Sequence, residues 1–215
     1  MNGDVSRDAS VPISAASLAI ACIVVWVVAA VSAALLGIWL AIGGAAVALG
    51  VAVLLFDRAA ARRILQPSPR LLLLGAAAGG AMAVATYVIY PVLVRIAPSI
   101  ATDTAALYAA FRAPSVTIAA LALAPIILGE ELVWRGVVQA ALARRVAPWA
   151  GVPLAALAYA LAHAPIGSPV LVVVALLCGI AWATLRAASG SLIPALAAHL
   201  VWDVVVLLWL PLDWR

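Results

Sequence analysis

Apolar residues dominate the chain in runs that are long enough to cross a lipid bilayer. A bilayer core takes about 20 helical residues, and stretches of roughly this length with few charges recur along the sequence. They cover residues 11–36, 37–56, 71–94, 115–144, 148–163, 169–186 and 192–210. The fourth is either one long tilted helix or two pieces joined near Pro125. The pattern predicts an all-α polytopic membrane bundle of about seven transmembrane helices.

The composition supports a membrane protein and excludes other classes. Hydrophobic residues make up 68% of the 215 positions, charged residues make up 9%, and the mean hydropathy is +1.26. About a quarter of the residues are charged in a soluble domain. The net charge of +4 comes from arginine alone, without the basic stripe and interleaved aromatics of a nucleic-acid surface. We therefore expect the lipid bilayer, and no nucleic acid, as a partner.

Arginine placement predicts the orientation of the chain. With seven spans, one side holds most arginines: Arg7, Arg58, Arg62, Arg63, Arg70, Arg144, Arg145 and Arg186. The other side holds Arg95, Arg112 and Arg215. The positive-inside rule makes the richer side cytoplasmic, so the N-terminus is predicted to be cytoplasmic and the C-terminus external. Tryptophans near span ends are typical of an interfacial belt; these are Trp39, Trp149, Trp209 and Trp214.

Several ionisable residues fall inside the predicted spans, where they are rare. An ionised group at the centre of a spanning helix costs roughly 2.5 to 3.5 kcal/mol. Both glutamates and both histidines of the chain nevertheless belong to the last four predicted spans, together with an arginine and an aspartate. The set is Glu130, Glu131, Arg135, His163, His199 and Asp203. Intramembrane ionisable residues mark functional sites, so we predict one polar site within the membrane.

Helical spacing groups these residues into ridges. Residues four apart share a helix face, and the pairs at this spacing are Glu131 with Arg135, Glu130 with Trp134, Tyr159 with His163, and His199 with Asp203. At about 1.5 Å per residue, Glu130 and His163 lie roughly 20 Å from the arginine-rich surface. His199 is expected nearer to that surface, at about 12 Å, unless its helix is tilted.

Three motifs carry a resemblance to a known family. EELVWR at residues 130–135 matches EExxxR, YALAH at 159–163 is similar to FxxxH, and HLVWD at 199–203 is similar to HxxxN/D. In this order they resemble the CAAX protease and bacteriocin-processing (CPBP, Abi) family of intramembrane glutamic endopeptidases, which includes myxosortase-like members. The motifs lie within residues 129–203. We predict a single membrane domain over 1–215, with N-terminal transmembrane helices and a loop over 1–113 and catalytic helices that carry the motifs over 114–210.

The resemblance also implies roles for the motif residues. Glu130 would be the general base that takes a proton from water, with His163 holding that water, while His199 and Asp203 would polarise the scissile carbonyl. Glu131 with Arg135 would support the site, as would Tyr159, which replaces the usual Phe. Asp203 stands where many members have Asn. Because an ionised Asp does not donate a hydrogen bond, Asp203 is expected to be protonated, to orient His199, or to mark a metal site.

Other interpretations of the same residues remain open. Glu131 and Arg135 are also explained as a pair that joins helices, and His199 with Asp203 as a clamp between helices. A metal-dependent site would use His163, His199 and Asp203, which are acceptable ligand types, although the HExxH spacing is absent. The sequence has no nucleotide-binding or cofactor motif, and we expect no cofactor.

These observations predict an intramembrane endopeptidase that cuts a membrane-tethered protein or peptide near a lipidated or hydrophobic terminus. The substrate would be a prenylated protein, a bacteriocin leader or a C-terminal sorting tag. The alternatives are a non-catalytic immunity or scaffold protein, and a proton-coupled transporter that uses the Glu, His and Asp cluster. The arginine- and alanine-rich, lysine-free composition suggests the inner membrane of a bacterium.

Overall fold

The protein is a bundle of helices. The computed structural model describes residues 14–56, 58–112, 115–147 and 149–212, and within these ranges it contains helices and no strand. The main helices are α1 (Ala15–Leu36), α2 (Gly44–Phe56), α3 (Arg58–Ile64), α4 (Pro69–Ile96), α5 (Ser99–Ala110), α6 (Val116–Glu131), α7 (Gln139–Ala143), α8 (Gly151–His163), α9 (Pro169–Ser189) and α10 (Ile193–Asp203). The predicted all-α fold is confirmed.

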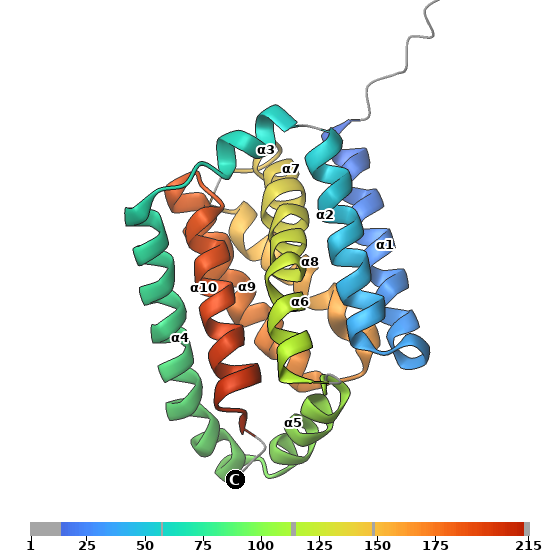
Figure 1. Ribbon diagram of the computed structural model, residues 1–215, viewed down its shortest axis with the longest axis vertical. Coiled ribbons are helices and arrows are strands. Elements are labelled where there is room, and N and C mark those ends of the chain that lie inside the picture. Colours follow the sequence, from blue (N-terminus) through green and yellow to red (C-terminus); the bar gives the residue numbers. More distant parts are fainter. Residues whose placement is uncertain (1–13, 57, 113–114, 148, 213–215) are drawn as a thin grey trace, which may run out of the picture.

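The long helices run side by side along one axis (Figure 1). The helix that contains α6 lies near the middle of the view, α1 and α2 lie on one flank, and α10 and α4 lie on the other. The short helices α3 and α5 lie at opposite ends of the bundle. Five helices are long and apolar enough to span a membrane, and two shorter apolar helices, Gly151–Ile166 and Ile193–Trp209, complete the predicted set. The chain is an integral membrane protein.

Serine residues determine where several helices begin. The hydroxyl groups of Ser14, Ser68, Ser115 and Ser168 each accept a hydrogen bond from the backbone N–H three residues further on. This contact satisfies one of the backbone donors that a helix start leaves free. In two cases proline follows the serine, at Pro69 and Pro169, where its fixed φ suits the first helical position. Serine, in two cases followed by proline, thus marks where a new helix begins within a largely apolar sequence.

The fourth predicted span is one continuous helical run over Val116–Ala143. Pro125 lies inside α6 without ending it, so the run is not divided there. The irregularity comes later, where the segment η2 (Leu132–Val138) forms π-helical turns directly after Glu131. A second π-helical segment, η4 (Val204–Trp209), follows Asp203 in the same way. π-Helical turns inside α-helices occur frequently at functional sites, and here they directly follow two of the predicted site residues.

Glycine allows the closest helix contacts. A side chain on Gly129 would collide with the carbonyl oxygen of Ala46 on α2, and a Cβ on Gly50 would lie 2.6 Å from the Cα of Gly129. A Cβ on Gly79 of α4 would lie 2.9 Å from the Cα of Ala198 on α10. Small residues let membrane helices approach closely where no hydrophobic force drives them together. These contacts fix the helices that carry Glu130 and His199.

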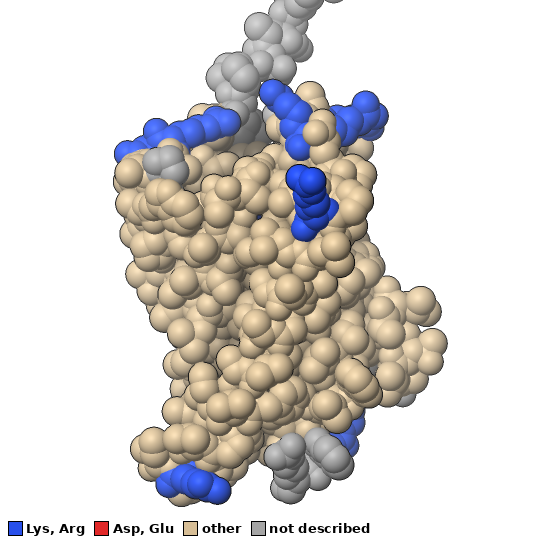
Figure 2. All heavy atoms as spheres, turned by 90° about the vertical axis from the view of Figure 1, so that its left-hand side faces the viewer, with Lys and Arg blue, Asp and Glu red and all other residues tan. Residues whose placement is uncertain are grey.

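Arginine side chains gather at one end of the molecule. Figure 2 shows most of the basic side chains at the end where Figure 1 places α3, few at the opposite end, and apolar surface between them. The sequence predicts a loop after the second span, whereas the structure has the short helix α3, which carries Arg58, Arg62 and Arg63. Alanine between these arginines favours helix. Arg7 and Arg215, which also entered the orientation argument, lie outside the described residues.

The arginine asymmetry makes a prediction about topology. Because Lys and Arg are retained on the cytoplasmic side, a reporter fused after Arg70 or Arg145 is expected to be cytoplasmic. One fused after Arg215 is expected to be external. A phosphatase reporter and a fluorescent reporter, each active on only one side, measure this in whole cells. A cytoplasmic signal after Arg215 would contradict the odd number of crossings.

Candidate active site

The site forms where three helical segments meet. Glu130 and Glu131 end α6, His163 ends α8, and His199 and Asp203 lie on α10. All of these side chains are buried. The structure therefore brings together the residues that the three motifs predicted.

Glu130 lies between the two histidines. Its Oε1 is 3.9 Å from Nε2 of His163, and its Oε2 is 3.6 Å from Nε2 of His199. Both separations exceed a direct hydrogen bond, which spans about 2.7 to 3.2 Å. The carboxylate and the two imidazole nitrogens therefore face one another, and each keeps hydrogen-bonding capacity for a further group.

Glu131 makes the direct contacts that Glu130 lacks. Its Oε1 accepts hydrogen bonds from Nη1 of Arg135 at 3.0 Å and from Nδ1 of His199 at 2.9 Å. The Glu131 side chain is 0% exposed. The guanidinium of Arg135 also lies over the rings of Tyr159 and Trp182, at 4.6 and 5.1 Å from their centroids, a cation–π arrangement. Glu131 thus joins its own helix to α10 through His199.

The partner of His163 determines which of its ring nitrogens carries the proton. Nδ1 is 2.8 Å from the backbone carbonyl oxygen of Tyr159, which only accepts hydrogen bonds. Nδ1 therefore carries the proton and donates it to that oxygen. In the neutral ring this leaves Nε2 as an acceptor, and Nε2 is the atom that faces Glu130.

His199 is held on two sides. Its ring stacks on the indole of Trp182 with centroids 3.6 Å apart, and its Nδ1 donates to Glu131. Nε2 is left facing Oδ2 of Asp203, 3.6 Å away, as well as Glu130. The expected proximity of His199 and Asp203 is present, although they make no direct hydrogen bond.

The structure corrects the depth that the sequence predicted for His199. His199 was expected to lie nearer the arginine-rich surface than Glu130, but the 3.6 Å separation places the two side chains at one level. The residue that precedes α10 is held inside the bundle. The backbone N–H of Leu192 donates to the carbonyl oxygen of Ile64 in α3, and Leu192 is fully buried.

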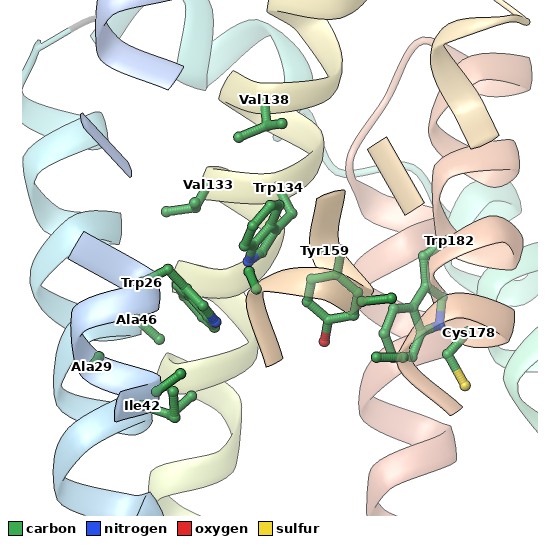
Figure 3. Close-up of a cluster of buried hydrophobic side chains, with 14 of the residues drawn as sticks. Trp26, Ala29, Ile42, Ala46, Val133, Trp134, Val138, Tyr159, Cys178 and Trp182 are labelled. Carbon is green, nitrogen blue, oxygen red and sulfur yellow. The ribbon is translucent and has the colours of Figure 1, made fainter. Parts of the chain in front are cut away.

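A row of buried aromatic side chains (Figure 3) contacts the histidines of the site. Trp26 on α1 meets Trp134, Trp134 meets Tyr159, and Tyr159 meets Trp182, with centroids 5.6, 5.2 and 6.3 Å apart. Sequence analysis missed Trp26 and Trp182, because it treated tryptophans as interfacial. Trp149 and Trp209 are indeed exposed, and Trp214 lies outside the described residues. The position of Trp26 in the middle of its predicted span is a signal that separates it from the interfacial group, whereas Trp182 lies near the end of its span at residue 186 and carries no such signal.

A cavity of about 630 Å³ opens beside the cluster. Glu130, Tyr159, His163, His199 and Asp203 line it, whereas Glu131 and Arg135 do not. Most of the remaining lining is apolar and comes from α4, α5 and α9, which the motifs do not cover. The two adjacent glutamates therefore differ: one faces the cavity and the other faces the packed interior.

The arrangement does not fit a metal centre. The metal-dependent hypothesis needs His163, His199 and Asp203 to converge on one point. Among the residues that the structure describes, no group of three or more His, Cys, Asp or Glu side chains is placed to hold a metal ion. The two histidines instead face Glu130 from two sides.

Fold and site together define a polytopic membrane protein with a buried Glu and His cluster that faces a cavity. The model of the family described as type II CAAX prenyl endopeptidase Rce1-like matches residues 111–205. This segment contains all three motifs, so the resemblance to CAAX proteases is confirmed over it. No curated protein and no solved structure matches the chain.

Proposed function

We propose that this protein is an intramembrane endopeptidase that hydrolyses a peptide bond of a membrane-tethered protein or peptide near a lipidated or hydrophobic terminus. The observation that carries the proposal is the position of Glu130, with Nε2 of one histidine on each side of its carboxylate and the cavity in front of it. The family match supports a protease of the CAAX type. The apolar cavity wall suits a hydrophobic substrate segment.

In the proposed reaction, water is activated at Glu130. The water donates one hydrogen bond to the Glu130 carboxylate and another to Nε2 of His163, which the Tyr159 carbonyl keeps as an acceptor. The water oxygen attacks the scissile carbonyl carbon as its proton passes to Glu130. General-base catalysis of this kind contributes typically about 10² to 10⁴-fold.

His199 and Asp203 are proposed to act on the carbonyl oxygen. Glu131 holds the Nδ1–H of His199. In the imidazolium form of this ring Nε2 carries a proton as well, and that proton points into the cavity and donates to the developing oxyanion. A donor fixed in advance is effective where water is scarce. A protonated Asp203 adds a second donor in the place of the family's more usual Asn. When the tetrahedral intermediate collapses, the C–N bond breaks and the proton on Glu130 passes to the leaving amine.

Purified protein reconstituted in lipid tests the proposal. We expect it to cut members of a library of apolar peptides, with the new termini identified by mass spectrometry. Cleavage should survive treatment with a chelator, because carboxylate and imidazole groups activate the water. Loss of cleavage that zinc restores would overturn the assignment of Glu130. No cleavage of any peptide, together with proton-coupled uptake into the vesicles, would favour a transporter.

A further inference from the structure

The cavity has a second polar region, away from the Glu and His cluster. Asp103 and Thr104 lie next to each other on α5 (Ser99–Ala110), and both line the same cavity as Glu130. In Figure 1, α5 lies at the end of the bundle opposite α3, the end with few arginines. One continuous space thus joins the cluster to a carboxylate and a hydroxyl on a different helix.

Neither side chain has a partner within the described chain. The hydroxyl of Thr104 is buried without a hydrogen bond, and the residue is 3% exposed. Asp103 is half-buried and forms no ion pair or hydrogen bond among the described residues. The arginines nearest in sequence, Arg95 and Arg112, are exposed. A buried polar group without a partner is costly, so the Thr104 hydroxyl, beside the carboxylate of Asp103, indicates a ligand.

The lining around Asp103 indicates the class of that ligand. No arginine of the described chain lines the cavity, and its two histidines, His163 and His199, belong to the cluster with Glu130. Carboxylate and hydroxyl oxygens accept hydrogen bonds, and the planar fork of a guanidinium presents several donors to such a pair. A guanidinium group in the cavity has donors for both the carboxylate and the hydroxyl that line it.

We propose that Asp103 and Thr104 form a subsite that binds the guanidinium group of an arginine in the substrate, and so contribute to its selection. The identity of the ligand as substrate rests on the proposed function. Along α4 the lining runs from Met82 to Leu93, about 16 Å at 1.5 Å per residue. That length accommodates about five extended residues, so the selected arginine lies within about five residues of the scissile bond.

A binding measurement tests the subsite without requiring cleavage. Short fluorescent apolar peptides carry a single arginine at successive positions, and each has a matched peptide with citrulline, which keeps the shape and removes the charge. The Glu130→Gln variant in lipid nanodiscs serves as the host, so that no probe is cut. At one or two positions the arginine peptide is expected to bind roughly five- to tenfold more tightly, and less so at high salt.

Substitutions on α5 then identify the side chains that cause the preference for arginine over citrulline. Asp103→Asn is expected to abolish the preference for arginine over citrulline, and Thr104→Val to reduce it by roughly threefold. Thr102→Asn is the matched control, because Thr102 is exposed on the same helix and does not line the cavity. It should leave the preference unchanged.

The subsite is overturned if no position shows an arginine preference, or if the preference survives Asp103→Asn. Higher thermal stability of Thr104→Val with an unchanged preference would remove Thr104 from the subsite. Failure of the wild-type protein to cut any peptide is a separate result, since it counts against the proposed endopeptidase while the binding comparison still decides on Asp103.

Discussion

Replacing Glu130 with Gln is expected to abolish cleavage while the protein still inserts and folds. Gln keeps the shape of the side chain but does not take a proton from water, so the contribution of the general base, about 10² to 10⁴-fold, is lost. The fold should tolerate the change because Glu130 makes no direct side-chain hydrogen bond to the residues that the structure describes, and the imidazole nitrogens of His163 and His199 lie 3.9 and 3.6 Å away. Turnover of a cleavable peptide and the melting temperature in detergent measure the two effects.

Cys178→Ala is the matched control for this experiment. Cys178 is buried and lines the same cavity as Glu130, but it has no place in the proposed chemistry. It should therefore retain turnover and lose only a little stability. Equal loss of turnover in both variants would show that the cavity shape, and not the carboxylate, limits the reaction. Full turnover in Glu130→Gln would exclude Glu130 as the base.

Contacts within one helix were the predictable part of the site. Spacing alone predicted that Glu131 meets Arg135, and their side chains are 3.0 Å apart. It did not predict that Glu131 also binds His199, because these residues are 68 positions apart and meet only through the packing of α6 with α10. The contribution of α4 and α5 to the cavity was not predictable either, because it depends on how the helices pack. An apolar helix has no sequence motif that indicates which of its faces lines the site.

The fold was predictable where chemistry is local. The lengths of the hydrophobic runs predicted where the main helices lie. Ser115, whose hydroxyl accepts a hydrogen bond at the start of α6, is a helix-start residue that can be recognised in the sequence. The depth of His199 was not predictable, since it depends on how α10 packs in the bundle. The hydrogen bond between Leu192 and Ile64 at the end of α3 joins segments far apart in the chain. Nor did periodicity indicate the π-helical turns after Glu131, because they change the register of a helix without changing its apolar pattern.

Replacing Glu131 with Gln is expected to fail differently from Glu130→Gln, because it damages the framework of the site. Arg135 is 2% exposed and would lose its counter-charge. In soluble proteins, breaking a buried pair from one side costs roughly 3 to 5 kcal/mol. For a protein of this size that corresponds to a fall in melting temperature on the order of 10 °C. Turnover should fall as well, since Nδ1 of His199 loses its anionic partner.

The double variant Glu131→Gln with Arg135→Gln separates these effects. Removing the orphaned charge should restore part of the melting temperature. The recovery is expected to be incomplete because Arg135 also lies over the rings of Tyr159 and Trp182. Turnover should stay low, because the contact between His199 and a carboxylate is still missing. If Glu131→Gln proves stable but inactive while Glu130→Gln remains active, the two adjacent glutamates have the opposite roles, and the base is the one that faces the packed interior.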